Sequence, residues 1–229
     1  MDADLEVKQG RSLVDAANNA HVEFSIWSSL LNIKKLTNGK LPNVYHFDAK
    51  AKIEEYSRAV GIPASYFLPG FYMSNLPGQS FKSSAPNDAW TLSLATPETA
   101  PIPMFDIADT GKVVKAMVLN RKQILGKRVL RAARYMTPKE IVEEFRALYP
   151  EDGKSANFVS VPHDIYLNTL KSFGLPDFAA KELLENMHLF DEGGYDGGAS
   201  LEESHALLED PLTTWIDFMK KSPAFKDLN

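Results

Sequence analysis

Two kinds of apolar spacing alternate over the first 70 residues. Apolar side chains recur at helical spacing over 5–20, and a β-rich run follows at 21–29. Helical spacing returns over 46–60, where Gly61 is a stop signal, and a second short apolar run covers 64–68. This order predicts a strand–helix–strand unit whose two strands run parallel in one sheet.

Beyond residue 75 the apolar spacing becomes less regular. Residues 76–90 are rich in Pro, Gly, Ser and Asn and are predicted to form a loop. The other predicted strands cover 90–95, 127–132 and 158–161, and an extended segment covers 101–106. Helices are predicted at 108–119, 138–148, 162–173 and 176–190, and the second of them follows the start signal Thr137-Pro138-Lys139-Glu140. A glycine-rich loop at 191–200 and a last helix starting at Asp210-Pro211 complete the chain's predicted elements. We therefore predict an α/β chain: a parallel-sheet domain at 1–75 and a smaller α+β region at 76–229, interleaved with the sheet.

The composition narrows the functional classes. The net charge of −5 argues against a dedicated nucleic-acid or membrane-surface binder, and the main basic run, Arg121–Arg134, is interpreted as solvated. The absence of cysteine excludes disulfides, thiol catalysis and thiolate metal sites, and it fits the cytosol or the nucleus. No apolar run approaches the roughly 20 residues of a membrane span, and the acidic, polar N-terminus does not match a secretory signal.

Ser28, His46 and Lys50 form the first candidate site. Ser28 lies where the first predicted strand ends, at the edge on which open α/β sheets bind ligands. His46 and Lys50 are four residues apart, so they share one face of the predicted helix. A Ser–Tyr–Lys set on this scaffold would support proton transfer during hydride exchange, but Tyr45 misses the required position by one residue, about 100° of helix rotation. The alternative is an ordinary surface His and Lys on a charged helix.

The segment 69–75 (PGFYMSN) follows directly after the second predicted strand. Gly70 would let the backbone approach a ligand closely, and the aromatic and amide groups beyond it suit a nicotinamide pocket. The candidate cofactor-binding residues here are Tyr72, Met73, Ser74 and Asn75. The alternative is a turn that ends the strand, with Phe71, Tyr72 and Met73 packed in the core.

Two further motifs are interpreted as ordinary surface. One is a set of metal-ligand types: Glu185, His188, Asp191 and Glu192. The sequence offers no second histidine near this set, so we predict no metal site, and His163 is assigned to the first turn of its own helix. The four glycines of 191–200 follow a helix and not a strand, so they form a loop and not a phosphate cradle.

Five segments, taken in order, point to a family. They read QGRSLVDAA, EFSIWSSL, NIKKLTNGKL, HFDAKAKIEEYSRAVGIP and LPGFYMSNL. They closely resemble the NmrA-like family, atypical short-chain dehydrogenase/reductase relatives that include fungal nitrogen-repression regulators and animal NADPH-sensor proteins. The resemblance is dense over 5–76 and continues more thinly through IPMFDIADTGKVV and DPLTTWIDFM. It implies the C-terminal part of a Rossmann-like NAD(P)-binding domain, and we interpret the chain as a truncated form without the family's strand and GxxGxxG turn.

The resemblance also assigns roles to the candidate residues. Lys50 of HFDAK would contact the nicotinamide ribose, and the run Tyr72-Met73-Ser74-Asn75 would border the nicotinamide end of NADP. Ser28 would lie at the relic catalytic strand end. His46 takes the place where active reductases hold their catalytic tyrosine, so the resemblance implies binding without turnover.

These observations together predict an NADP(H)-responsive regulator that acts with a protein partner. Cofactor binding should be weak or lost, because the glycine-rich turn that binds the pyrophosphate is not among the 229 residues. The strand at 21–29 would be an unpaired border, which favours homo-oligomerisation or dependence on a partner. Two alternatives stay open: an NADP-dependent reductase of small carbonyl or phenolic compounds with Lys50 as proton-relay base, and a pure interaction module in which 76–229 binds another protein.

Overall fold

The computed structural model describes residues 2–84 and 89–229. The first third of the chain forms α1 (Ala3–Asn19), β1 (Ser25–Ser28), α2 (Ile33–Leu36), α3 (Tyr45–Val60), β2 (Ala64–Pro69), β3 (Phe71–Tyr72) and the 3-10 helix η1 (Met73–Asn75). The middle third forms β4 (Phe81–Ser84), β5 (Ala89–Leu94), β6 (Ile102–Phe105), η2 (Ile107–Asp109), α4 (Thr110–Leu119), α5 (Arg121–Ile124), β7 (Arg128–Arg131), β8 (Arg134–Met136) and α6 (Pro138–Leu148). The last third forms β9 (Asn157–Ser160), α7 (His163–Ser172), α8 (Asp177–Glu192), α9 (Glu202–His205) and α10 (Trp215–Lys221).

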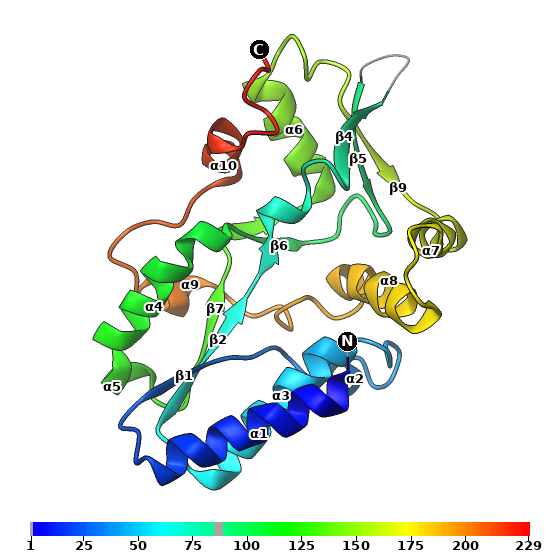
Figure 1. The fold of residues 1–229 in the computed structure, drawn as a ribbon. Helices are drawn as coiled ribbons and strands as arrows, with labels where there is room; N and C mark the ends of the chain where they lie inside the picture. The colour runs from blue at the N-terminus through cyan, green and yellow to red at the C-terminus, as the bar shows by residue number, and fades with distance from the viewer. Residues whose placement is uncertain (1, 85–88) are drawn as a thin grey trace.

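The first sheet holds the predicted strand–helix–strand unit (Figure 1). β1 pairs with β2 and β2 pairs with β7, all parallel, so the strand order is β1-β2-β7. α3 connects β1 to β2 and ends at Gly61, whose left-handed backbone (φ 82°) favours a residue without a Cβ. The predicted α/β fold with a parallel sheet is confirmed.

The borders of this sheet bear on two further predictions. Among the described strands β1 pairs with β2 alone, so it lies at the edge of the sheet, and association through this edge stays a prediction. The opposite border, β7, comes from the part of the chain beyond residue 75. Strands from both sides of residue 75 therefore contribute to one sheet, and the division of the chain into two interleaved parts stays a prediction.

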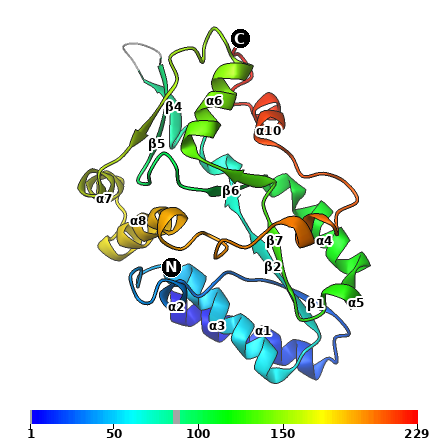
Figure 2. The ribbon, with the colours of Figure 1, turned by 180° about the vertical axis from the view of Figure 1, so that it is seen from behind.

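Helices cover both faces of the parallel sheet (Figures 1 and 2). α3 lies against one face, and α1 packs along α3. This contact is close because Gly10 of α1 meets Ile53 of α3 at distances that leave no room for a Cβ. On the other face, Met117 of α4 packs in one cluster with Phe67 of β2. The strand side chains that alternate between the faces are thereby buried on both sides, as is typical of parallel sheets.

The other two sheets, β3-β6-β8 and β4-β5-β9, share the largest hydrophobic core with α6, α8 and α10 (Figure 2). Aromatic rings fill its centre: the Phe145 centroid lies 4.6 Å from that of Phe81, 5.2 Å from that of Trp90 and 5.6 Å from that of Phe225. Within the described residues, no helix is both long and apolar enough to cross a membrane.

Two local predictions are wrong. Residues 81–84 form β4, antiparallel to β5, where a loop was predicted; residues 85–88 of that predicted loop lie outside the described residues. The last helix does not start at Asp210-Pro211. Its N-cap is Thr214, whose hydroxyl accepts the Asp217 backbone N–H at 3.1 Å. A threonine three residues before an acidic residue is the stronger start signal, because it satisfies a free N–H at the first turn.

The basic run Arg121–Arg134 is not uniformly solvated. Arg131, the last residue of β7, is fully buried. Its Nη1 donates to the Ser204 carbonyl oxygen at 3.2 Å, while Nε and Nη2 have no hydrogen-bond partner in the described residues. Burial lowers the pKa of Arg131 to about 10. Composition alone misses this residue, because the side chains of a strand alternate between opposite faces of the sheet.

Gly70 stands where the chain passes from the first sheet to the second. A Cβ here would collide with the Pro103 carbonyl oxygen and lie 2.7 Å from the Arg131 carbonyl oxygen. Backbone atoms cannot rotate away, so we expect Gly70→Ala to lower the free energy of unfolding by roughly 1–3 kcal/mol. Gly111→Ala in α4, where nothing lies within 4 Å, should be neutral or stabilising by up to about 1 kcal/mol. Urea unfolding of both variants tests this, and equal effects would contradict it.

Candidate functional site

The carboxyl ends of the parallel strands define the edge at which an open sheet binds ligands. β1 ends at Ser28, β2 at Pro69 and β7 at Arg131. Ser28 is exposed, whereas the next residue, Ser29, is fully buried. The first predicted site residue therefore lies at the expected edge, and its neighbours determine which chemistry is available there.

His46 lies in the first turn of α3 and is held by a glutamate of α8. Oε1 of Glu182 accepts hydrogen bonds from the His46 backbone N–H (2.8 Å) and from its Nδ1 (2.7 Å). Since a carboxylate only accepts, Nδ1 carries the proton. The N-cap of α3 is Val44, which makes no side-chain cap hydrogen bond. The Glu182 carboxylate therefore accepts a backbone N–H of the first turn of α3 that has no partner within the helix. Its negative charge is also favourable at the N-terminal end of the helix dipole.

Lys50 lies one turn beyond His46 and forms an ion pair with α1. Its Nζ lies 2.8 Å from Oε1 of Glu6, and the two side chains are 31% and 25% exposed. His46 and Lys50 thus contact carboxylates on two different helices, and a ligand oxygen that binds Lys50 must compete with Glu6. Tyr45 does not complete the set, because its hydroxyl donates to Oδ1 of Asn43 at 2.6 Å.

The four candidate residues after β2 divide into accessible and buried positions. Tyr72 is half-buried, with its ring centroid 6.2 Å from that of Phe105, and burial raises the pKa of its hydroxyl. Met73 is fully buried in the largest core. Ser74 and Asn75 are exposed on η1. Tyr72, Ser74 and Asn75 are therefore open to a ligand, whereas the Met73 side chain would first have to leave the core.

The glycine-rich loop brings two buried residues near this site that sequence reasoning missed. Tyr195 stacks on Phe190, with centroids 5.5 Å apart and planes at 16°. The pKa of Tyr195 is raised, mainly by burial and further by the charges of Asp196 and Tyr72. Burial also raises the pKa of Asp196 to about 7, against the opposing effect of a hydrogen bond from the Tyr135 hydroxyl. The loop thus holds a buried carboxyl group with a raised pKa next to Tyr195, whose own pKa is also raised by Tyr72 of the predicted nicotinamide border.

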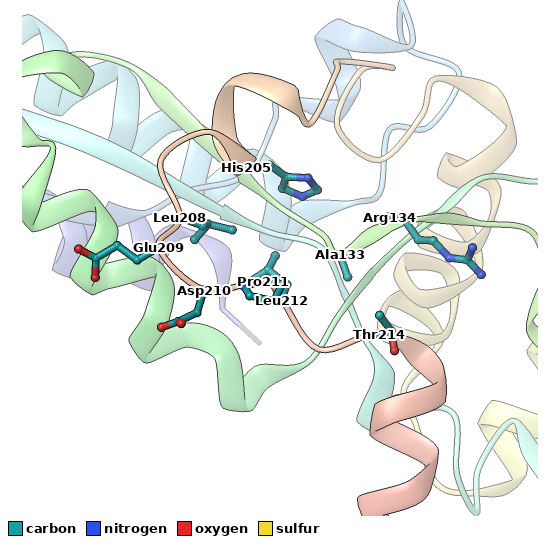
Figure 3. Close-up of a pocket in the computed structure, with 9 residues that line it drawn as sticks. All are labelled: Ala133, Arg134, His205, Leu208, Glu209, Asp210, Pro211, Leu212 and Thr214. Atoms are coloured by element: carbon teal, nitrogen blue, oxygen red, sulfur yellow. The ribbon is translucent and has the colours of Figure 1, made fainter.

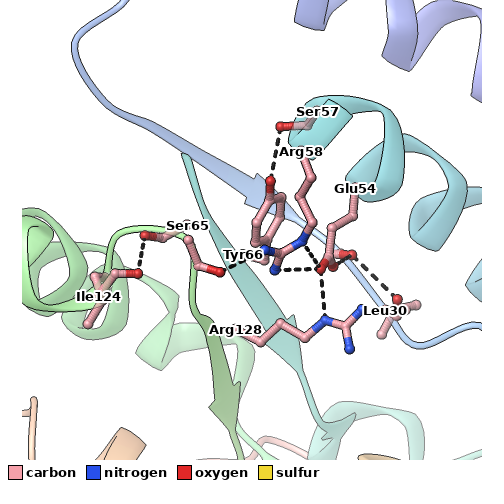
Figure 4. A network of polar contacts seen from close by, with 10 residues as sticks. Leu30, Glu54, Ser57, Arg58, Ser65, Tyr66, Ile124 and Arg128 are labelled. Atoms are coloured by element: carbon pink, nitrogen blue, oxygen red, sulfur yellow. Dashed lines mark hydrogen bonds and ion pairs between the residues drawn. The ribbon is translucent and has the colours of Figure 1, made fainter. Parts of the chain in front are cut away.

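A buried carboxylate ties α3 to the sheet beside the end of β1 (Figure 4). Glu54 is fully buried and accepts hydrogen bonds from the Ser29 hydroxyl (2.6 Å), Arg58 Nε (2.9 Å) and Arg128 Nε (2.8 Å). This network joins α3 to the end of β1 and the start of β7. It also engages the hydroxyl of buried Ser29, so Ser28 is the exposed serine at the end of β1.

A separate hollow of about 410 Å³ lies beyond the carboxyl end of β7 (Figure 3). Its lining is formed by Ala133, Arg134, His205, Leu208, Glu209, Asp210, Pro211, Leu212 and Thr214. His205 donates through Nε2 to the Ala132 carbonyl oxygen at 2.8 Å, because a carbonyl only accepts. The lining contains none of the residues predicted from the sequence, so this hollow is distinct from the predicted site.

A model of the NmrA-like family matches residues 1–219. The chain belongs to the NmrA-like family. The nitrogen metabolite repression protein nmr of Neurospora crassa is 27% identical to this chain over 209 residues. The match covers 87% of this chain and 42% of the relative. An NmrA-like family domain-containing protein of Dictyostelium discoideum is 26% identical over 145 residues, 60% of this chain and 48% of the relative. The chain thus spans less than half the length of these curated relatives.

Solved structures of other proteins share the Rossmann-like fold of this chain. NmrA, a negative transcriptional regulator, in complex with NADP has a TM-score of 0.78 at 18% identity, over 97% of this chain and 69% of that chain. Triphenylmethane reductase of Citrobacter sp. complexed with NADP(H) has a TM-score of 0.72 at 15% identity, over 99% of this chain and 72% of that chain. A regulator and a reductase thus share this fold, and the choice between these functions depends on the site residues.

Proposed function

We propose that the chain is a regulatory NmrA-like protein that responds to NADP(H) without turnover and passes the response to a protein partner. The observation that carries this proposal is the set of contacts that the side chains at the start of α3 make. The position four before Lys50 is His46, whose Nδ1 proton is engaged by Glu182. A phenolic proton donor would have to stand at that position to serve a bound carbonyl, and the Tyr45 hydroxyl is directed to Asn43 instead.

The proposed ligand contact lies at the carboxyl edge of β1 and β2. The nicotinamide end would border Tyr72, Ser74 and Asn75, and the Lys50 ammonium would bind the ribose. Because Lys50 already pairs with Glu6 of α1, the cofactor and Glu6 compete for one cation. Binding of the cofactor would therefore weaken the contact between α1 and α3, which gives the protein a physical means of reporting the ligand.

The affinity of this site is expected to be low. In the described residues, no strand leads through a glycine-rich turn into a helix, so these residues do not supply the cluster of backbone N–H groups that usually binds the pyrophosphate. Contacts at the nicotinamide end alone give an expected Kd of roughly 0.1–1 mM, or about 4–5.5 kcal/mol of binding free energy.

Titration calorimetry with NADPH and NADP⁺ tests the proposal. We expect Glu6→Gln to tighten binding by roughly three- to tenfold, because Lys50 is released, and Lys50→Ala to weaken it by a similar factor. Glu55→Gln is the matched control, since Glu55 pairs with Lys35 on the exposed outer side of α3. A micromolar or tighter Kd would contradict the low affinity, and equal effects of the two glutamate variants would remove Lys50 from the site. NADPH oxidation that disappears in Lys50→Ala would support the reductase alternative instead.

A further inference from the structure

A second hollow, of about 380 Å³, lies at the carboxyl ends of β5 and β9. These two strands are parallel neighbours, so the residues that follow them emerge at the same edge. Thr96 follows β5, and Ser160 ends β9. The remaining walls come from α7 and α8, which lie side by side (Figure 1), and from Lys40 and Leu41 after α2. The position resembles that of a ligand site in an open parallel sheet, on a sheet separate from the one that carries the NADP(H) proposal.

Two residues of this lining contain buried polar atoms without partners. Thr96 is 2% exposed, and its Oγ1 has no hydrogen-bond partner in the described residues. Nε2 of His188 is likewise buried and unpaired. The neighbouring Ser160 hydroxyl, in contrast, donates to the Thr96 carbonyl oxygen at 2.9 Å. Since nearly all buried polar atoms in proteins are paired, two unpaired ones around a single hollow point to an occupant that pairs with them.

The structure brings a second histidine to this place. The His163 ring lies 4.1 Å from the His188 ring between centroids, although the sequence analysis expected no second histidine near His188. The described residues nevertheless contain no group of three ligand types arranged to hold a metal ion. Burial, and then His163, lower the pKa of His188, which keeps its imidazole neutral near pH 7. The described lining thus offers no set of three metal-ligand side chains, and its two unpaired polar atoms suit an organic occupant.

Two helix ends of opposite polarity line the hollow. α7 begins at His163, and its N-cap, Pro162, makes no side-chain cap hydrogen bond, so this end presents free N–H groups and partial positive charge. α8 ends with Asp191 and Glu192, at the negative end of its dipole. Glu192 is neutralised by Lys40 at 2.7 Å, whereas Asp191 forms no ion pair within the described residues. The hollow thus offers donors on one helix end and a free carboxylate on the other.

We propose that this hollow binds a small dipolar molecule that carries an acceptor group and a donor group a few bonds apart. The acceptor, a carboxylate or an amide carbonyl, is bound by the Thr96 hydroxyl and the first turn of α7. The donor, an ammonium or an amide N–H, is bound by Asp191. This inference does not rest on the NADP(H) site, which lies at the edge of a different sheet.

Four probes and three variants test the inference. Glycine, acetamide, acetate and methylamine are titrated into the whole chain while the ring resonances of His163 and His188 are followed by NMR. We expect glycine or acetamide to give saturable shifts, with a Kd on the order of millimolar for so small a ligand, and acetate and methylamine to bind at least about tenfold more weakly. Asp191→Asn should abolish glycine binding and spare acetamide binding, which distinguishes the two donor chemistries.

Thr96→Val removes the unpaired hydroxyl and preserves the shape of the side chain. We expect at least an about tenfold loss of affinity for the bound probe, with an unchanged or raised Tm, because the hydroxyl has no partner to lose. Thr169→Val, on the exposed side of α7, is the control and should leave binding unchanged. Unsaturable or equal shifts with all four probes, unchanged binding in Thr96→Val, or a lower Tm or loss of folding in that variant would each overturn the proposal.

Discussion

Glu54→Ala is expected to lower the free energy of unfolding by about 3 kcal/mol, the low end of the range for breaking a buried ion pair. Glu54 is fully buried and accepts from Ser29 and from two arginines. Truncation leaves the buried Ser29 hydroxyl with only its long hydrogen bond to the Leu30 carbonyl oxygen (3.4 Å), and it opens a cavity between α3 and the sheet. Arg58 and Arg128 are 41% and 42% exposed, so water partly replaces their lost partner, and this exposure is why the higher values of the range are not expected.

The neighbouring glutamate is the matched control. Glu55 pairs with Lys35, but both side chains are more than half exposed, so Glu55→Ala should cost at most about 1 kcal/mol. Urea unfolding of both variants at pH 7 measures the difference. Similar losses in the two would mean that the Glu54 network contributes no more than a surface pair.

Local spacing predicted the elements that bury one continuous apolar stripe. The crossover from β1 through α3 to β2 follows from helical spacing over 46–60 and from Gly61, and both signals lie inside the elements that they describe. β3 and β8 are two and three residues long, too short for a period of two to be recognised. Both pair with β6, which is distant from them in the sequence, so pairing and not propensity determines these strands. β4 lies inside a stretch rich in Pro, Gly, Ser and Asn, whose composition predicted a loop, although it pairs with the next strand, β5.

The candidate site shows the same division between local and long-range information. The spacing of His46 and Lys50 predicted a shared helix face, but it could not reveal that Glu182 and Glu6 engage them, because those partners are 136 and 44 residues away. Composition likewise indicated that 191–200 is a solvated loop. A tyrosine next to an aspartate between glycines was the available signal, since an aromatic ring rarely stays in water when a core lies beside it.

Asp196→Asn should stabilise the protein at pH 8 by up to about 4 kcal/mol. Burial raises the Asp196 pKa from 3.8 to about 7 in the folded protein, a rise of about 3 units at about 1.4 kcal/mol each. Between about pH 4 and pH 7 the folded state keeps a proton that the unfolded chain releases. The free energy of unfolding therefore falls as the pH rises through this window and levels off above it. Asparagine stays neutral throughout, so the variant avoids the cost of a buried charge.

Urea unfolding at several pH values from 4 to 8 measures this linkage. The wild-type and Asp196→Asn curves should meet near pH 4 and separate steadily up to pH 7. Tyr135→Phe provides a second test. The Tyr135 hydroxyl shares its one proton between the Ala199 carbonyl oxygen (3.0 Å) and Oδ2 of Asp196 (3.3 Å), and the bond to Asp196 opposes the rise in its pKa. Without that donor the carboxyl should hold its proton to a higher pH, and the decline in stability should continue beyond pH 7. Parallel curves for wild type and Asp196→Asn would show that Asp196 is solvated in the folded protein. A steep decline would instead mean that the glycine-rich loop beside Tyr72 is held more tightly in acid than in base, so the surroundings of the proposed nicotinamide border change within the physiological pH range.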